Sequence, residues 1–413
     1  MTSEVKERID QLRHGIVPEG YKRTKVGICP EDWVENVLGD IYTERKEPGK
    51  EGLPLLMVSI HSGVSDGEVG EKDLPKRFKR IEDKSQYKRA VVGDLVFNMM
   101  RAWQGAIGSV RTEGMVSPAY VVAKPNDMVD PLFMDYYMKT NRMVHTIHRQ
   151  SYGVTDFRLR LYWESFAPIP CVLPPAREQK KIAEILTTQG KVIELEQQKI
   201  EEIIKVKRFF LEKMFPKKGK AVPEIRFKGF TDPWEQRKLG DTVQITMGQS
   251  PDGSTYSDVP SDYILVQGNA DLQNGWVFPR VWTSQMTKKA DVGDLIMSVR
   301  APAGAMGKTA YNAVIGRGVA AIKGNEFIYQ LLVKMDSDGY WKALSCGSTF
   351  ESLNSDNIKN ADMLIPDVSE QEKIGEYFAN LDRLITLHQR KLEEEKEKKK
   401  ALMQLLLTGI VRV

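Results

Sequence analysis

Three short motifs in this chain contain residues that could bind a nucleotide or a metal. The Gly-Lys-Thr at 307–309 resembles the end of a phosphate-binding loop, but that motif needs a glycine where the chain has Pro302. The Gly-x-Gly-x-x-Ala at 316–321 would bind a dinucleotide or S-adenosylmethionine only if it opened a helix, and its apolar end is expected to form a strand. His145 and His148 could share one helix face as metal ligands, but no carboxylate cluster lies near them. We therefore predict no catalytic, cofactor or metal site in this chain.

A pair of glycine-rich loops offers a different chemistry. Arg101 begins Arg-Ala-Trp-Gln-Gly, and Arg300 begins Arg-Ala-Pro-Ala-Gly; each loop follows an apolar segment expected to be a strand. Glycines let the backbone approach a partner closely, and an arginine beside them can bond to a phosphate or a guanine edge. The alternative is a structural turn whose arginine forms an internal salt bridge.

Other polar side chains in loops could also contact DNA. Gln and Asn pair with adenine, and Arg pairs with guanine or phosphate. Ordinary surface loops have the same composition, and this is the alternative for every member of the set. The predicted DNA-binding residues are Arg101, Gln104, Arg158, Arg160, Gln249, Gln267, Asn269, Arg300 and Lys308.

The arginine loops belong to two copies of one unit of about 200 residues, a self-similarity that constrains the fold more than any single motif does. Residues 174–215 align with residues 366–407 without a gap at an offset of 192, and 13 of these 42 positions are identical. Upstream, the Val-Gly-Asp-Leu at 92–95 recurs at 292–295. The matches follow the same order with similar spacing, so the chain contains an internal repeat.

The copies differ between their matched blocks. Trp33 followed by Leu-Gly-Asp recurs as Trp234 followed by Leu-Gly-Asp, whereas residues 43–90 and 242–290 cannot be aligned. A shared frame with two different variable surfaces predicts one protein that recognises two different targets.

Each copy ends in a long segment with apolar residues at alternating spacings of four and three, which is typical of a coiled coil. About 40 residues in a helix span roughly 60 Å. We predict that the two helices pack on each other; two independent amphipathic helices are the alternative. Polar residues such as Gln189 and Glu196 interrupt the pattern and are expected to fix its register. The predicted coiled-coil and subunit-docking residues are Ile182, Leu186, Ile193, Ile200, Ile203, Phe210, Ile374, Phe378, Leu381, Ile385, Leu392 and Leu402.

Composition narrows the class of protein. The 413 residues are 41% hydrophobic and 28% charged with a net charge of +4, so any DNA binding must come from local patches or from partners. Three widely spaced cysteines predict neither a disulfide framework nor a zinc site and fit a reducing cytoplasm. The chain has no long apolar run, and neither a membrane span nor a signal peptide is expected.

The ordered motifs resemble the specificity (S) subunits of type I restriction–modification systems. The matching stretches include Val-Pro-Glu-Ile-Arg-Phe at 222–227 and Gly-Gln-Ser-Pro at 248–251. The most specific are Leu-Pro-Pro at 173–175 with Glu-Gln-x-x-Ile after it, and Ile-Pro at 365–366 with the same continuation. Each motif alone is weak, but the ordered duplication is specific and covers nearly the whole chain.

The first copy departs from the family pattern. Val17 to Trp33 is four residues longer than Val222 to Trp234, and the first copy has no Gly-x-Ser-Pro.

The resemblance implies an architecture and a function. The expected fold is α+β, with two globular α/β target-recognition domains separated by two long helices in an antiparallel coiled coil and related by an internal pseudo-two-fold repeat. Each domain would recognise one half of a bipartite site on double-stranded DNA, while the helices set the spacer and dock two modification (methyltransferase) subunits. The implied domains are an N-terminal helical segment and linker (1–28), recognition domain 1 (29–173), a central helical repeat and linker (174–220), recognition domain 2 (221–365) and a C-terminal helical repeat (366–413).

In such a complex this chain would be a non-catalytic, cytoplasmic subunit without a cofactor of its own. The modification subunits would supply the S-adenosylmethionine site, and two restriction subunits would supply the motor and nuclease, with ATP and Mg. Three alternatives stay open: a methylation-only or orphan DNA-recognition scaffold, a methyltransferase with an unrecognised site, and a scaffold that only recruits proteins.

Overall fold

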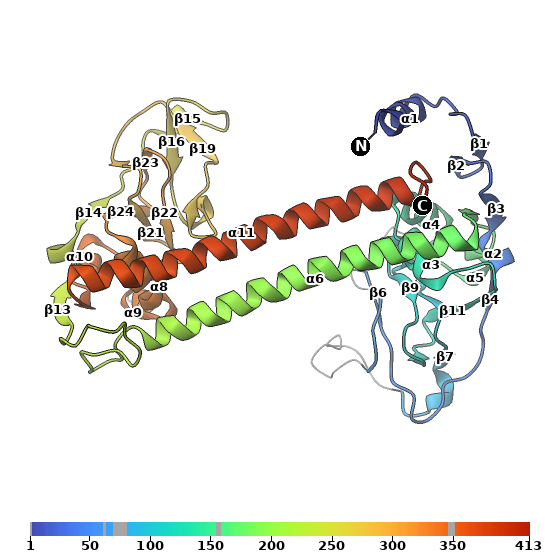
Figure 1. The fold of residues 1–413 in the computed structure, drawn as a ribbon, viewed down its shortest axis with the longest axis horizontal. Helices are drawn as coiled ribbons and strands as arrows, with labels where there is room; N and C mark the ends of the chain where they lie inside the picture. The colour runs from blue at the N-terminus through green and yellow to red at the C-terminus, as the bar shows by residue number, and fades with distance from the viewer. Residues whose placement is uncertain (1, 61–62, 69–80, 154–157, 346–351) are drawn as a thin grey trace. The chain divides into compact units, whose positions relative to one another are not determined.

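The chain folds into two compact units in a computed structural model that describes residues 2–60, 63–68, 81–153, 158–345 and 352–413 (Figure 1). Unit 1 comprises Met1–Glu194 with Glu393–Val413, and unit 2 comprises Leu195–Leu392. Each unit therefore holds a globular α+β part and a portion of both long helices. Cys29 and Cys171 are free and buried, and Cys346 lies outside the described residues.

A four-stranded antiparallel sheet lies at the centre of unit 1, in the order β4-β11-β8-β9. Side chains alternate across it: Leu95 and Phe97 of β8 enter one buried cluster and Val96 enters another. The sheet's strands are β4 (Tyr42–Glu44), β8 (Leu95–Asn98), β9 (Ile107–Ser109) and β11 (Tyr120–Pro125). The remaining strands pair in twos: β1 (Tyr21–Thr24) with β2 (Gly27–Pro30), β3 (Val34–Val37) with β12 (Pro170–Leu173), β5 (Val58–Ser59) with β6 (Gly63–Val64), and β7 (Lys88–Ala90) with β10 (Gly114–Val116).

Unit 2 repeats the same frame and extends it. The order β14-β24-β21-β22 matches β4-β11-β8-β9, and Ile296 again faces the opposite cluster from Leu295 and Met297. The extended sheet contains β14 (Gln244–Met247), β17 (Leu272–Gln273), β18 (Trp276–Val277), β21 (Leu295–Ser298), β22 (Met306–Lys308) and β24 (Val319–Lys323). A second, five-stranded sheet contains β15 (Tyr256–Ser257), β16 (Tyr263–Val266), β19 (Val281–Thr283), β20 (Lys289–Ala290) and β23 (Ala313–Ile315), and β13 (Glu235–Lys238) pairs with β25 (Asp362–Ile365).

Short helices accompany each frame. Capping side chains begin several of them; for example, Thr140 accepts a hydrogen bond from Met143 N, so the helical pattern that follows β11 forms two helices rather than one. In unit 1 the helices are α1 (Ser3–Arg13), α2 (Leu38–Ile41), α3 (Pro131–Tyr137), α4 (Asn141–Gln150) and α5 (Trp163–Phe166), with 3-10 turns η2 (Lys84–Gln86) and η3 (Ala102–Gln104). In unit 2 they are α7 (Leu239–Thr242), α8 (Glu326–Ser337), α9 (Tyr340–Ser345) and α10 (Ser355–Lys359), with η5 (Gly253–Thr255) and η6 (Asn269–Asp271).

The duplicated Val-Gly-Asp-Leu motif is a tight turn that leads into β8 or β21. Gly93 and Gly293 adopt φ of 93° and 92°, a left-handed conformation that favours glycine. The Asp94 carboxylate accepts a hydrogen bond from Val91 N and pairs with Arg45 at 2.7 Å, which raises the pKa of Arg45. The motif therefore has a structural role in both copies.

The long helices α6 (Ala176–Lys213) and α11 (Val368–Leu406) run in opposite directions in Figure 1, and side chains join them within each unit. In unit 1, Gln189 Nε2 donates to the Glu395 backbone oxygen at 3.2 Å. In unit 2, the ion pair of Lys207 with Asp382 measures 2.6 Å. A later residue of α6 thus contacts an earlier residue of α11, as expected for antiparallel helices. The predicted antiparallel pairing is confirmed.

A buried polar layer interrupts the helix pair in unit 2. The Glu196 carboxylate, 3% exposed, contacts His388 Nδ1 and Lys391 Nζ at 2.7 Å each. Hydrogen bonds from Lys391 and His388 lower the pKa of Glu196 to about 2. Glu196 and His388 are equivalent repeat positions, 192 residues apart. They can bond to each other only where the local two-fold axis of the helix pair passes between them.

A buried glutamate at the start of each long helix holds the neighbouring segment in place. In unit 2, Arg226 forms two bonds of 2.7 Å with Glu370. In unit 1, Arg412 near the C-terminus contacts the equivalent Glu178 at 2.6 Å, and Trp33 Nε1 donates to that carboxylate at 3.1 Å. The C-terminal segment of the chain thus completes the unit that contains the N-terminal segment.

Candidate nucleic-acid interface

The two predicted arginine loops lie at the same place in the frame of each unit. Arg101 follows β8 and Arg300 follows β21, and each loop turns at a glycine, Gly105 or Gly304, with φ of 99° or 103°. Both arginines are exposed, and neither has a carboxylate partner among the residues that the structure describes. Among the described residues, neither arginine thus forms the internal salt bridge that was the alternative for these loops.

Two more loops of unit 2 meet the Arg300 loop at one edge of its sheets. Loops 248–251, 266–269 and 298–304 all adjoin the segment 315–318. The backbone of this segment therefore organises most of the polar residues predicted in unit 2. The bonds are Gln249 N to Ile315 O (2.8 Å), Gly316 N to Val266 O (2.8 Å), Val299 N to Gly318 O (2.8 Å) and Arg317 N to Ser250 Oγ (3.1 Å).

The edge defined by these four segments of unit 2 presents Gln249, Asn269, Arg300 and Arg317 as exposed side chains, with Gln267 half-buried. Its backbone packs closely, since a Cβ on Gly318 would lie 1.9 Å from the Gln267 carbonyl oxygen. Amide and guanidinium groups on a rigid edge are suited to bond to base edges and phosphates.

Arg317 was not among the residues predicted from the sequence. Its Gly-Arg-Gly context was considered only as a nucleotide-binding motif, and that motif fails because residues 319–323 form β24 rather than a helix. An arginine between two glycines, in a loop next to other polar loops, is the signal that could have identified it.

Unit 1 brings its predicted residues together more loosely. Leu161 N donates to Met99 O at 2.9 Å, so the segment carrying Arg158 and Arg160 runs beside the Arg101 loop. Arg158, Arg160 and Gln104 are exposed.

Lys308 lies apart from the other predicted residues. It pairs with Leu295 at the start of β21, whereas Arg300 follows the end of that strand. Its ammonium group bonds to Glu326 at 3.0 Å and lies 4.6 Å from the centre of the Tyr329 ring. The side chain is 14% exposed, an arrangement that suits packing better than contact with DNA.

The structural context of the other motifs is unlike a catalytic site. The Gly-Lys dipeptide lies in β22 rather than in a loop before a helix, so it does not form a phosphate-binding loop. Within the described part of the chain, no three His, Cys, Asp or Glu side chains come close enough to hold a metal ion. None of the described helices combines the length and hydropathy needed to cross a bilayer.

All twelve apolar positions predicted for the helix pair are buried or half-buried. Ile182 and Leu186 enter the core of unit 1, and Ile374 and Phe378 enter the core of unit 2. The first turns of each helix thus belong to a globular core, and the later turns pair with the other helix.

Two α+β units built on one strand order, each with an exposed arginine loop, define a duplicated recognition scaffold. The sequence matches the family described as the type I restriction modification DNA specificity domain over residues 120–205 and 231–397. The chain belongs to this family of type I specificity subunits, which are the non-catalytic part of type I restriction–modification enzymes.

Two relatives agree with this assignment. The chain is 28% identical to the putative type I restriction enzyme MjaX specificity subunit of Methanocaldococcus jannaschii, covering 96% of this chain and 97% of that protein. It is 24% identical to the MjaVIII specificity subunit of the same organism, with 96% of each chain covered.

Two solved structures share the fold. A chain from a study of complex assembly and conformational transition of the type I restriction–modification system has a TM-score of 0.56 at 22% identity and covers 93% of this chain and 99% of that one. The type I S subunit from M. genitalium has a TM-score of 0.58 at 12% identity, with coverages of 91% and 96%.

Proposed function

We propose that this chain directs a type I modification complex to a bipartite site on double-stranded DNA, with each unit recognising one half. The observation that carries the proposal is the pair of exposed arginine loops on equivalent frames with different surrounding strands. Because the frames match, both units can approach the duplex in the same way. Because the neighbouring loops differ, they would contact different bases.

The contact residues proposed in unit 2 are those of the edge formed by its four loop segments, with Arg317 added to the residues predicted from sequence. In unit 1 they are Arg101, Gln104, Arg158 and Arg160. The recognition domains would correspond to residues 29–173 and 221–365, with the helical repeats after each. The modest net charge of +4 suits a subunit whose partners supply much of the phosphate contact.

The helix pair is proposed to dock two modification subunits. Leu195 and Leu387 are equivalent repeat positions, identical in type and 55% and 56% exposed. Other large apolar side chains of the two helices are also exposed, among them Ile204, Phe209 and Leu384. An exposed apolar patch is typical of a partner surface. These partners, with two restriction subunits, would supply S-adenosylmethionine-dependent methylation and the ATP- and Mg-dependent steps.

Charge substitution tests the docking surface. Leu195→Asp and Leu387→Asp should each weaken binding of one modification subunit and leave the other bound, measured by native mass spectrometry of the reconstituted complex. Leu344→Asp, which changes an exposed leucine of α9 rather than of the two long helices, is the control. Equal retention of both subunits by all three variants would contradict docking at these positions.

The helices are also proposed to set the spacer between half-sites. Inserting four residues after Gln197 adds about 6 Å of helix and a rotation of about 40°, which corresponds to one or two base pairs at about 3.4 Å each. Genomic methylation mapping should then show unchanged half-sites with a spacer one or two base pairs longer. An unchanged spacer at full affinity would refute this role of the helices.

A further inference from the structure

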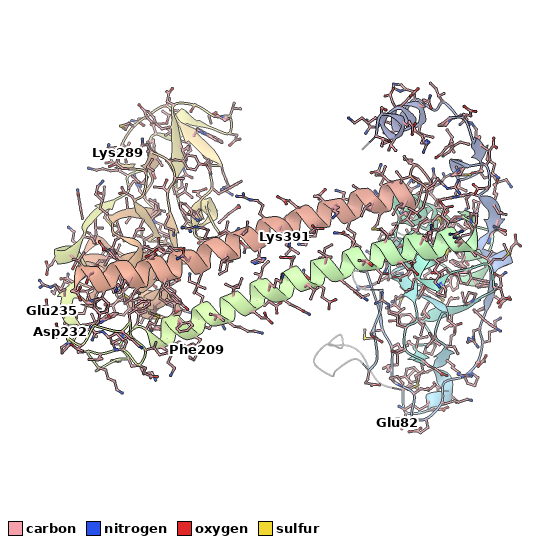
Figure 2. The ribbon with its side chains drawn as sticks, viewed as in Figure 1. Glu82, Phe209, Asp232, Glu235, Lys289 and Lys391 are labelled. Atoms are coloured by element: carbon pink, nitrogen blue, oxygen red, sulfur yellow. The ribbon has the colours of Figure 1, made fainter. Side chains whose placement is uncertain are left out.

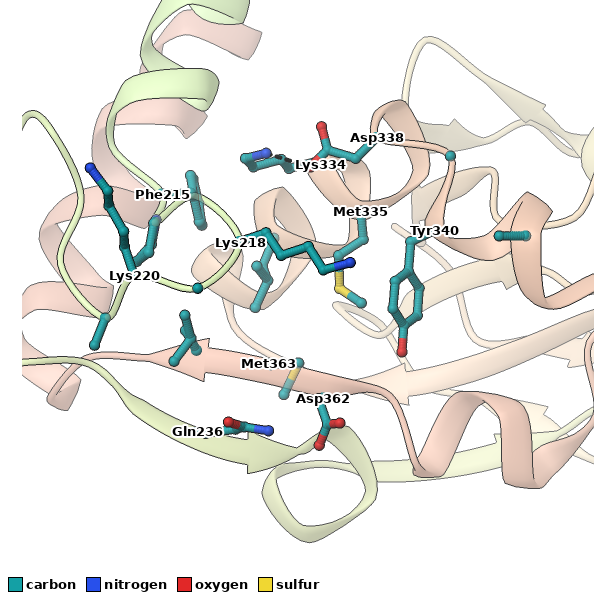
Figure 3. Close-up of a pocket in the computed structure, with 17 residues that line it drawn as sticks. Phe215, Lys218, Lys220, Gln236, Lys334, Met335, Asp338, Tyr340, Asp362 and Met363 are labelled. Atoms are coloured by element: carbon teal, nitrogen blue, oxygen red, sulfur yellow. Dashed lines mark hydrogen bonds and ion pairs between the residues drawn. The ribbon is translucent and has the colours of Figure 1, made fainter.

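Unit 2 contains a cavity of about 950 Å³ beside the C-terminal end of α6 (Figure 3). Its walls are largely apolar, with Phe215, Met335 and Met363 among them, and it opens under the linker that follows α6. This volume lies in the range of pockets that hold a ligand or an inserted segment. Nothing in the proposed DNA contact uses it.

Unit 1 has almost no cavity at the equivalent place, where a volume of only about 40 Å³ remains. The two cavities are lined by residues at equivalent positions of the repeat, 192 residues apart. The residue of unit 1 is given first in each pair: Leu407 and Phe215, Thr408 and Pro216, and Val172 and Leu364. Thr140 and Met335 form a further equivalent pair. Thr140 lies ten residues after Asp130, which caps α3, and Met335 lies ten residues after Asn325, which caps α8. The two places therefore correspond in the frame.

The difference comes from the hairpin β1–β2, which fills the place in unit 1. Val26 and Cys29 of this hairpin form a buried cluster with Trp33 and Val172. The hairpin lies in the linker that is four residues longer in the first copy. In the shorter linker of unit 2, described throughout, no strand lies between α6 and β13. The same frame position is thus filled by polypeptide in one unit and open in the other.

The charges at the mouth of the cavity indicate what could enter it. Lys334 is already paired with Asp338 at 2.5 Å. Lys218 and Lys220, on the linker, have no carboxylate partner among the described residues, and Asp362 is the remaining acidic group on the opposite wall. The linker side of the mouth therefore carries two positive charges that an acidic segment would neutralise.

We propose that this cavity receives an extended segment of a modification subunit that carries bulky apolar side chains and at least one carboxylate. The segment would occupy the position that β1–β2 occupies in unit 1, with its apolar side chains against Phe215 and Met335 and its carboxylate toward Lys218 and Lys220. This inference rests on the proposed function. Because unit 1 already fills the position, only one of the two modification subunits would be anchored in this way.

Filling the cavity tests the proposal. Ala343 lines it, whereas the adjacent exposed Leu344 does not. Ala343→Trp should weaken one of the two modification-subunit binding steps by at least ~10-fold, about 1.4 kcal/mol, and leave the other unchanged, measured by titration calorimetry. Leu344→Trp is the matched control and should bind both subunits normally.

Charge reversal at the mouth gives a second measurement that leaves the apolar walls of the cavity unchanged. Lys218→Glu combined with Lys220→Glu should weaken the same binding step, with a salt-dependent effect, whereas Lys228→Glu, an exposed lysine of the same linker, should not. If the unaltered chain binds no modification subunit, the proposed function is wrong. If it binds two and both Ala343→Trp and the double reversal bind two with unchanged affinity, the cavity proposal alone is overturned.

Discussion

Units 1 and 2 share a strand order but differ in what surrounds it. The frame of four strands, the glycine turn before the central strand and the arginine loop after it are the same in both. Around this frame, unit 1 adds isolated two-stranded pairs and unit 2 adds a five-stranded sheet. Positions that the two copies share thus maintain the fold and present the loop, while the segments that differ surround the loop with different strands.

The two units should differ most in the stability that they lose when the buried glutamate at the start of a long helix loses its arginine partner. Glu370 is fully buried and bonded to Arg226, so Arg226→Ala leaves a buried charge unpaired and should lower the free energy of unfolding by ~3–5 kcal/mol. Arg412→Ala should destabilise less, because Arg412 is 39% exposed and Glu178 retains its bond from Trp33. Chemical denaturation measures both; equal losses would show that the two contacts are equivalent.

Replacing each loop arginine should impair recognition of one half-site and leave recognition of the other unchanged. Arg300→Ala should weaken DNA binding by ~1–3 kcal/mol and relax one half-site, and Arg101→Ala should do the same at the other. Lys308→Ala is the comparison, because its ion pair with Glu326 predicts lower stability with little change in DNA affinity. Fluorescence anisotropy with oligonucleotides altered in one half tests this. A lower melting temperature at unchanged affinity for Arg300→Ala would instead mean a structural role.

A glycine in α6 marks a smaller difference. Lys207 pairs with Asp382 in unit 2, but the equivalent Lys399 in unit 1 faces Gly190 and lies 5.4 Å from the centre of the Tyr136 ring, where burial lowers the pKa of Lys399. Gly190→Asp would recreate the ion pair and remove a helix glycine, so it should raise stability by ~1 kcal/mol. Gly190→Ala is the control, because it removes the helix glycine without adding a carboxylate for Lys399. Destabilisation by Asp but not by Ala would show that Lys399 cannot form the pair.

Acid should weaken the polar layer at the local two-fold axis of the helix pair. The pKa of Glu196 is about 2 in the folded chain because Lys391 and His388 bond to it, against an ordinary 4.5. The carboxylate therefore contributes stability that is complete above its unfolded pKa and is lost as the pH falls from about 4.5 toward 2. Denaturation of the native chain and of Glu196→Gln across this range should show their stability difference shrinking. A constant difference would mean that Glu196 does not titrate as described.

The long helices and the positions of the arginine loops could be predicted because their sequence motifs occur in both copies of the repeat. The offset of 192 sets the helix register, and the same offset predicts that Glu196 and His388 are equivalent, although not that they touch. The position of Lys308 could not be predicted, because its partner Glu326 is 18 residues away and lies on a different element. The cavity could not be predicted either, since it depends on four residues that the second linker lacks.

Exchange of one recognition domain tests the central claim most directly. Residues 231–365 would be replaced by the corresponding domain of a family member with a known site, and methylation would be mapped in genomic DNA from cells carrying the hybrid and its modification subunit. We expect one half-site to become that of the donor, while the other half-site and the spacer stay as they were. A change in both half-sites, in a hybrid that still methylates, would contradict the assignment of one half-site to each unit.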